Sequence, residues 1–207
     1  DVSGSMSGKI GTLAQGVGQA VAALRPEDRF RIITFNNRAQ DITHGWVAAT
    51  PANVNTWVER VTQLPAGGST NLYAGVTMCL KDLDDDRAST VVLVTDGVTN
   101  TGIVSPKTFL AIMSTYDVRF FGFLLGNSAN WPLMRVMCDA SGGFYTGVSN
   151  SDDIIGQIML AKSKVTHEAL HQASLKVEGG KVFDVSDPNL GKVYRGQQLV
   201  IFGRYNQ

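Results

Sequence analysis

Apolar residues follow two alternating patterns over the first 165 or so positions of the chain. In several stretches they recur every three or four positions, and this period predicts amphipathic helices. Between these stretches stand solid runs of β-branched and aromatic residues, which predict strands buried on both faces of a parallel sheet. The expected helices lie at 9–24, 54–64, 72–83, 109–116, 132–140 and 152–164, and the expected strands at 29–35, 90–95, 118–125 and 144–148.

This alternation predicts an α/β fold with a doubly wound, mostly parallel sheet flanked by helices, as in Rossmann-like domains. Near residue 170 the alternation of helical and strand patterns ends. Apolar runs at 173–177 and 182–185 flank Gly179-Gly180, which indicates a hairpin, and 198–205 predicts a further strand. We therefore expect one domain over residues 1–170 and a partial, incomplete β element over residues 171–207.

Two local signals refine the expected helices. Thr50-Pro51 is typical of a cap and first turn, so it should begin the second helix. Gly11, Gly16 and Gly18 fall inside the first helix, where glycine is unfavourable, and we expect them to permit close packing.

Composition excludes several classes of protein. Eighteen Lys and Arg residues balance eighteen Asp and Glu residues, so the chain lacks the basic surplus of a nucleic-acid-binding protein. The 43% hydrophobic content argues against disorder. No apolar run approaches the roughly 18 residues of a spanning helix, so no direct membrane insertion is expected. Cys79 and Cys138 each fall on an apolar helical face, which favours buried free thiols over a disulfide.

Three short polar segments carry the candidate chemistry: residues 1–5 (Asp-Val-Ser-Gly-Ser), 67–71 (Gly-Gly-Ser-Thr-Asn) and 95–97 (Thr-Asp-Gly). Together they offer two carboxylates and several hydroxyls. Hard cations such as Mg²⁺ prefer such oxygen donors. Asp96 ends an expected strand, where open α/β sheets bind their ligands. Since no Cys or His joins these segments, zinc is disfavoured.

Each segment also has a simpler interpretation. Ser3 and Ser5 could cap a helix, and Thr70 could cap the helix that starts at Asn71. Asp96-Gly97 alone is most often a turn. The placement of all three segments at one edge of the expected sheet favours an ion site over three unrelated caps and turns.

Asp1-x-Ser3-x-Ser5, Gly68-Ser69-Thr70 and Thr95-Asp96-Gly97 together resemble the metal-ion-dependent adhesion site of von Willebrand factor type A domains, over about residues 1–168. The resemblance implies a Mg²⁺ ion, or else Mn²⁺ or Ca²⁺. The hydroxyls of Ser3, Ser5 and Thr70 would ligate it, and Asp1 and Asp96 would bind it directly or through water.

The resemblance also implies a partner and a topology. A sixth position on the ion would take an Asp or Glu carboxylate from a partner protein, and the domain would switch between closed and open forms. In the family a strand precedes the Asp-x-Ser-x-Ser loop, and we expect this first strand to be missing from the fragment. The partner-binding rim is expected to comprise Ser69, Asn71, Asn100, Thr101 and Trp131. Core packing for Trp131 and turn formation for Asn100 and Thr101 remain alternatives.

The tail adds a second resemblance. Asp187-Pro188 and residues 194–205 are similar to the segment that follows the type A domain in inter-alpha-trypsin-inhibitor heavy-chain-like proteins. Many bacterial members of that group are exported and envelope-associated. The resemblance therefore implies an exported protein of the cell envelope or extracellular space, with its targeting segment outside this fragment.

Enzyme motifs give no competing interpretation. Gly8-Lys9 lacks the remainder of a phosphate-binding P-loop, and no Gly-x-Ser-x-Gly elbow occurs. The expected ion site offers hydroxyls and no obvious base. We therefore expect a non-catalytic adhesion or interaction domain that depends on a divalent cation. Two alternatives stay open: an intracellular assembly factor working with an AAA-type ATPase, and a metal-dependent phosphohydrolase.

Overall fold

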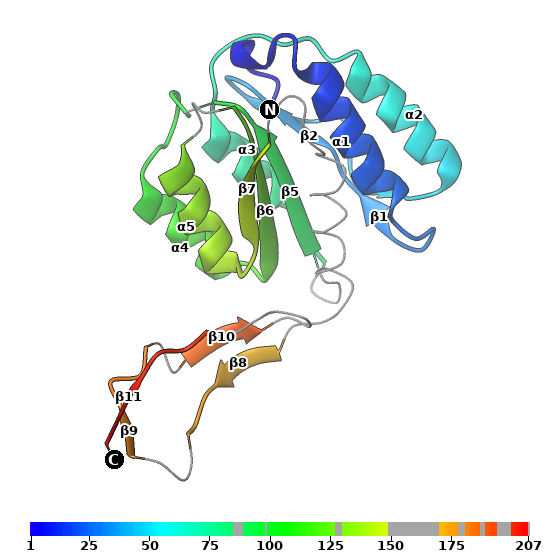
Figure 1. Ribbon diagram of the computed structural model, residues 1–207. Helices are drawn as coiled ribbons and strands as arrows, with labels where there is room; N and C mark the ends of the chain where they lie inside the picture. The colour runs from blue at the N-terminus through cyan, green and yellow to red at the C-terminus, as the bar shows by residue number, and fades with distance from the viewer. Residues whose placement is uncertain are drawn as a thin grey trace. The chain divides into compact units, whose positions relative to one another are not determined.

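The computed structural model describes residues 1–84, 89–97, 99–126, 130–148, 170–177, 181–186, 189–193 and 200–206. The chain divides into two compact units, Asp1–Lys162 and Ser163–Gln207 (Figure 1). The helix expected at 152–164 and the Gly179-Gly180 pair lie outside the described residues. The division into domains at about residue 170 stays a prediction.

The first unit contains the alternating helices and strands that the periodicity predicts. Its helices are η1 (Gly4–Met6), α1 (Ile10–Ala22), α2 (Pro51–Thr62), α3 (Leu72–Cys79), α4 (Pro106–Thr115) and α5 (Trp131–Ser141). Its strands are β1 (Arg29–Phe30), β2 (Ile33–Phe35), β3 (Ala39–Asp41), β4 (Val47–Ala48), β5 (Ser89–Thr95), β6 (Val118–Leu125) and β7 (Phe144–Val148). The short strands β3 and β4 carry too few apolar residues for the pattern to have predicted them.

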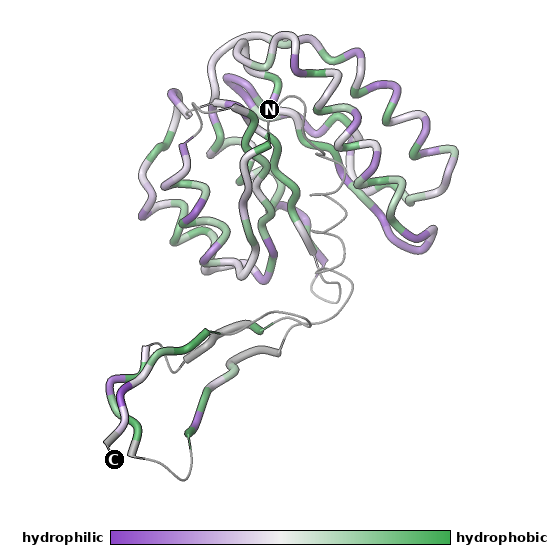
Figure 2. The backbone as a smooth tube through the Cα atoms, viewed as in Figure 1, coloured by the Kyte–Doolittle hydropathy of each residue, from purple (hydrophilic) through white to green (hydrophobic). Residues whose placement is uncertain are grey.

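The strands β5, β6 and β7 form a parallel sheet in that order, with Val94 opposite Phe123 and Phe123 opposite Thr146. Every residue of β6 is buried, as expected for a solid apolar run in the middle of a sheet. Figure 2 shows the hydrophobic colour concentrated along β5 and β6. The doubly wound α/β fold predicted from the sequence is confirmed.

Helices pack on both sides of the strands, α1 and α2 on one side and α4 and α5 on the other (Figure 1). The larger core joins α3, α4 and α5 to the sheet, and Phe109, Phe120 and Met137 are fully buried within it. A smaller core joins α1 and α2 to β1 through Val21, Val54 and Phe30. The larger core therefore includes the parallel sheet, whereas the smaller core joins α1 and α2 to the pair β1 and β4.

The local signals on α1 and α2 are confirmed in part. The Thr50 hydroxyl accepts a hydrogen bond from the Asn53 backbone nitrogen at 3.4 Å, and so caps α2. A Cβ at Gly18 would lie 3.1 Å from the Val58 side chain, so Gly18 does permit close packing of α1 on α2. The same expectation is wrong for Gly11, because that glycine is exposed and faces open space.

Residues 1 and 2 lie between β5 and β2. The Asp1 backbone nitrogen donates to the Val94 carbonyl oxygen at 3.0 Å, and the Val2 nitrogen donates to the Phe35 oxygen at 2.9 Å. These bonds place the N-terminal segment at the carboxyl ends of both strands (Figure 1). That end of a parallel sheet is where α/β folds bind ligands.

In the residues of the second unit that the structure describes, short strands form two antiparallel pairs. Its strands are β8 (Leu170–Ser174), β9 (Lys181–Phe183), β10 (Asn189–Val193) and β11 (Arg204–Asn206). The expected hairpin between 173–177 and 182–185 is wrong, because β8 pairs with β10 and β9 pairs with β11. The glycine pair is a local signal, whereas the observed pairing depends on strands that follow later in the chain.

Both cysteines are free thiols, as the sequence favoured. Burial raises the pKa of Cys79 and of Cys138 to about 12, so both stay protonated at neutral pH. Among the described residues, no helix has the length and apolarity needed to cross a membrane.

Candidate metal centre

Two of the three polar segments are in direct contact through their side chains. The Ser5 hydroxyl donates to Asp96 Oδ1 at 2.7 Å, and the Ser3 and Ser5 hydroxyl oxygens lie 3.1 Å apart. Asp1 Oδ1 accepts from the Ser3 backbone nitrogen at 2.8 Å, and Asp1 Oδ2 accepts from the Thr95 hydroxyl. The loop before α1 and the end of β5 therefore form one polar cluster.

The third segment reaches the same cluster through Thr70. A Cβ at Gly97 would lie 3.2 Å from Thr70 Oγ1 and 3.5 Å from Ser5 Oγ, so both hydroxyls face the Gly97 backbone. The Thr70 backbone is fixed by Asn100, whose Oδ1 accepts from the Thr70 nitrogen at 2.9 Å. The absence of a side chain at Gly97 leaves room where these two hydroxyls converge.

The simpler capping interpretations do not account for these hydroxyls. Ser3 is the N-cap of η1, but its side chain makes no capping hydrogen bond. The N-cap of α3 is Asn71, whose Oδ1 accepts from the Ala74 nitrogen at 3.1 Å. The Ser3 and Thr70 side chains point into the cluster instead of satisfying helix ends.

The two carboxylates of the cluster are buried, Asp1 at 7% exposure and Asp96 at 3%. Buried carboxylates repel one another and are costly without a compensating cation. Here the Lys9 ammonium is that cation, because Lys9 Nζ contacts Asp96 Oδ2. Lys9 was not among the residues that the sequence predicted for this site. Lys9 lies four positions after Ser5, but η1 ends at Met6 and α1 begins only at Ile10, so the two residues share no helix and their spacing does not predict the contact.

Two side-chain amides that were not among the predicted site residues hold the segment 67–71 in place. Asn36 Nδ2 donates to the Gly67 carbonyl oxygen at 2.9 Å, and Asn37 Oδ1 accepts from the Ser69 nitrogen at 2.6 Å. The same segment contains Gly68, whose backbone φ of +83° is rarely adopted by residues other than glycine. Asn36 and Asn37 come directly after β2, and polar residues at a strand end were the available signal.

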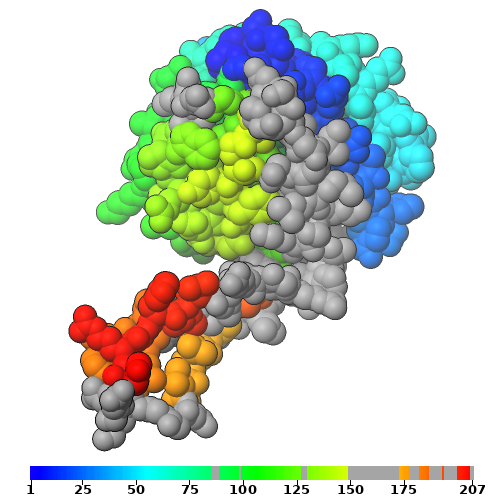
Figure 3. Space-filling model, in the orientation of Figure 1, coloured from blue at the N-terminus to red at the C-terminus, as the bar shows by residue number. Residues whose placement is uncertain are grey.

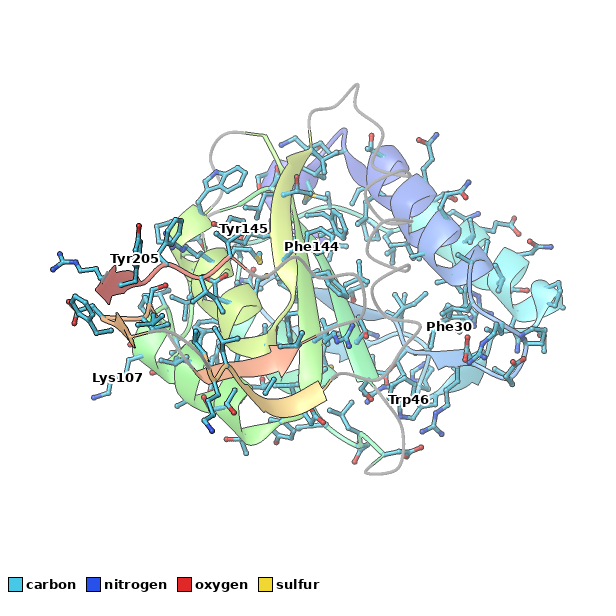
Figure 4. All side chains as sticks on the ribbon, turned by 60° about the horizontal axis from the view of Figure 1, so that its bottom comes forward. Phe30, Trp46, Lys107, Phe144, Tyr145 and Tyr205 are labelled. Atoms are coloured by element: carbon cyan, nitrogen blue, oxygen red, sulfur yellow. The ribbon has the colours of Figure 1, made fainter. Side chains whose placement is uncertain are left out.

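The structure separates the expected rim residues into two groups. Ser69, Asn71, Asn100 and Thr101 lie in the loops around Thr70, and Asn71 is used to cap α3. Trp131 instead packs on β7, its ring centroid 6.0 Å from that of Tyr145, which Figure 4 labels. Trp131 is 36% exposed, so this contact is not the core packing that the sequence left open as an alternative, and its place on the rim stays a prediction.

The donor set determines which ions the site could hold. In the described part of the chain, no cluster of three or more His, Cys, Asp or Glu side chains could bind a metal ion. The candidate centre has only two carboxylates, and its other donors are the hydroxyls of Ser3, Ser5 and Thr70. Oxygen donors alone suit a hard divalent cation, and the Lys9 ammonium already marks a position where positive charge is favourable.

The site is open to solvent on one side. Ser5 and Asn100 are exposed, whereas Ser3, Thr70 and Asp96 are buried beneath them. Figure 3 shows the N-terminal residues, in dark blue, at the surface of the first unit. A group from outside the molecule could therefore approach the cluster from the side of Ser5.

Replacing Thr95 with valine is expected to destabilise the first unit by about 1–3 kcal/mol, because the buried Asp1 carboxylate loses a hydrogen-bond donor. Valine has nearly the shape of threonine, so the change removes little packing. Urea denaturation would measure the loss, with Thr95→Ser as the control that keeps the hydroxyl. Equal stability of the valine and serine variants would contradict the role of this hydrogen bond.

Comparison with known proteins supports the fold. The family model for the von Willebrand factor type A domain matches residues 1–146. Inter alpha-trypsin inhibitor, heavy chain 4, of Mus musculus is 26% identical over 219 aligned residues, which cover 99% of this chain and 23% of that protein. The chain thus spans about a quarter of the length of this relative.

Solved structures share the fold at lower identity. A von Willebrand factor type A protein from Catenulispora acidiphila superposes with a TM-score of 0.72 and 16% identity, covering 93% of this chain and 48% of that one. Proximal thread matrix protein 1 from the mussel byssus superposes with a TM-score of 0.61 and 16% identity, covering 78% of this chain and 43% of that one. In this structure of the mussel protein, zinc occupies the metal-ion-dependent adhesion site (MIDAS) motif.

Proposed function

Because the chain belongs to the von Willebrand factor type A domain family, in its inter-alpha-trypsin-inhibitor heavy-chain-like group, we propose that it binds a protein partner through a bound divalent cation. Asp1, Ser3, Ser5, Thr70 and Asp96 hold the ion. A carboxylate of an Asp or Glu on the partner completes its coordination. The domain itself carries out no chemical reaction.

The convergence of the segments 1–5 and 67–71 on Asp96 and Gly97 is the observation that carries this proposal. Ser5 reaches Asp96 across 91 positions of sequence, and the Gly97 backbone faces both Ser5 and Thr70. Such an arrangement costs stability, since it buries two carboxylates and several hydroxyls at one sheet edge. A cation that all of these oxygens can share offsets that cost.

The oxygen donors favour Mg²⁺ as the physiological ion, with Mn²⁺ or Ca²⁺ as the alternatives. The zinc-occupied site of the mussel protein supports a divalent ion at this position of the fold, although no Cys or His is present here to favour zinc. When bound, the ion supplies a Lewis-acidic centre that attracts a carboxylate. The protein side chains fix its position and leave one side open to solvent.

The surrounding loop supplies contacts for the partner. Asn100 is exposed beside Thr70, and Thr101 follows it. Ile103 and Val104, farther along the same loop, are 41% and 48% exposed. A partner whose acidic residue is flanked by apolar side chains would match this surface, because apolar contacts around a central polar anchor exclude water.

The relationship to the heavy-chain group favours a place outside the cytoplasm, in the cell envelope or the extracellular space. It weighs against the assembly factor that works with an AAA-type ATPase. A metal-dependent phosphohydrolase would need a basic group at the site, and Lys9 is such a group. The Lys9 amine already contacts Asp96, which weighs against this second alternative. A phosphatase assay with Mg²⁺ and Mn²⁺ is expected to show no turnover.

Isothermal titration of Mg²⁺ and Mn²⁺ into the protein is expected to show one saturable site that is lost in Ser5→Ala. Ser7→Ala is the matched control, because Ser7 is an exposed serine two residues farther along. A second titration in the presence of acetate or an acidic peptide should tighten ion binding, since the carboxylate completes the coordination. Retention of the site in Ser5→Ala, or no binding with or without acetate, would contradict the proposal.

A further inference from the structure

Lys9 occupies a position for which lysine is locally unsuited. It is the N-cap of α1, with φ −108° and ψ −8°, and its side chain makes no capping hydrogen bond. Ser, Thr, Asp and Asn are favoured there, because their side chains accept from free backbone N–H groups. A positive charge also opposes the helix dipole at this end. Such a departure from local preference points to a role elsewhere.

The role is visible in the contacts of Asp96. Its Oδ1 accepts from the Ser5 hydroxyl at 2.7 Å, and its Oδ2 contacts the Lys9 ammonium. The Asp96 side chain is only 1% exposed. Lys9 therefore supplies the positive charge that this buried carboxylate requires in the structure as it stands.

We propose that Lys9 is an internal counter-cation that competes with the divalent ion for Asp96 and thereby sets the affinity of the site. This inference rests on the proposed function, because it assigns Lys9 a part in the same ion site. A divalent ion close to Asp96 and the ammonium repel each other at short range in a partly buried site. Ion binding must therefore displace the Lys9 side chain.

The structure allows this displacement without disturbing the fold. The Lys9 backbone is held at the start of α1, since its nitrogen donates to the Met6 oxygen at 2.9 Å and its oxygen accepts from Leu13 at 3.0 Å. The side chain is 28% exposed and ends a flexible stem of four carbons. The ammonium can therefore move to solvent while the backbone stays in place. Because ion binding breaks the Lys9–Asp96 ion pair, the free energy of binding is less favourable by the free energy of that pair.

Titration of Mg²⁺ and of Mn²⁺ into Lys9→Met tests the proposal. Methionine keeps the length and apolar character of the lysine stem but removes its charge. We expect the dissociation constant for either ion to fall by at least about tenfold. Lys9→Arg keeps the charge and should stay within about threefold of the parent.

A second measurement separates competition from general damage to the site. Without divalent ions, in EDTA, Lys9→Met should unfold about 2–4 °C below the parent, because Asp96 has lost its cation. Saturating Mg²⁺ should remove this deficit, so the ion should stabilise the variant more than the parent. Lys107→Met is the matched control. Lys107 is an exposed lysine on α4, and Figure 4 shows it at the rim of the molecule, far from the N-terminal segment.

The outcomes distinguish this inference from the function on which it rests. Tighter binding in Lys9→Met, with parent-like binding in Lys9→Arg and Lys107→Met, supports the competition. Equal affinities in the parent and Lys9→Met would overturn it while leaving the ion site intact. If neither protein binds Mg²⁺ or Mn²⁺, even with acetate present, both the proposed function and the role of Lys9 are wrong.

Discussion

Mg²⁺ is expected to raise the thermal midpoint of the parent protein and to leave that of Asp96→Asn unchanged. Ligand binding to the folded state stabilises it by about 2.7 kcal/mol when the free ion is at 100 times its dissociation constant. Asparagine keeps the shape of aspartate and can still accept from the Ser5 hydroxyl. It removes the negative charge that holds the cation, so the stabilisation should disappear while the fold remains.

The matched control for this prediction is Asp139→Asn. Asp139 is an exposed residue of α5, and its carboxylate pairs with Arg135 one turn away. It is a surface pair of the kind that contributes little to stability. The control variant should therefore respond to Mg²⁺ as the parent does. Equal shifts with Mg²⁺ in Asp96→Asn and the parent would show that the ion, if it binds, binds elsewhere.

The fold could be predicted from the sequence because its central strands are unambiguous. The residues of β6 are almost all apolar, and the bounds of β6 and β7 agree with the predicted ranges. When continuous apolar strands alternate with amphipathic helices, few architectures other than an α/β fold are compatible with the sequence. The strands β3 and β4 have only three and two residues, which is too short for an apolar pattern to predict them. The pairing of β8 with β10 was missed for another reason, because it joins strands that are not neighbours in the sequence.

The candidate site was predictable where the motif residues provide the donor atoms themselves. Ser3, Ser5 and Asp96 were chosen as oxygen donors from their residue types and positions, and the structure brings their side chains together. The residues that support them could not be chosen in this way. The Asn37 amide and the Lys9 ammonium act through the orientation of their side chains, which depends on how α1 and β2 meet in the folded domain.

Gly143→Ala is expected to destabilise the first unit by about 3 kcal/mol or more. A Cβ at Gly143 would overlap the carbonyl oxygen of Phe120, a backbone atom in the middle of the sheet that no rotamer change can move. The Gly143 nitrogen donates to the Cys138 oxygen at 2.8 Å, and the Ser141 hydroxyl accepts from the Phe120 nitrogen at 2.9 Å. The end of α5 is thus held directly against β6, and an added methyl group would push the two apart.

Urea denaturation of Gly143→Ala against Gly11→Ala tests whether this effect comes from the contact or from glycine as such. Gly11 lies in α1 with open space around its Cα, so alanine there should stabilise the helix by about 0.5–1 kcal/mol. Because β6 pairs with β5, displacement of β6 should also disturb the end of β5, which Asp96 directly follows. We therefore expect Gly143→Ala to weaken Mg²⁺ binding as well, whereas Gly11→Ala should not. Similar stabilities for the two variants would mean that α5 can move away from β6 at little cost.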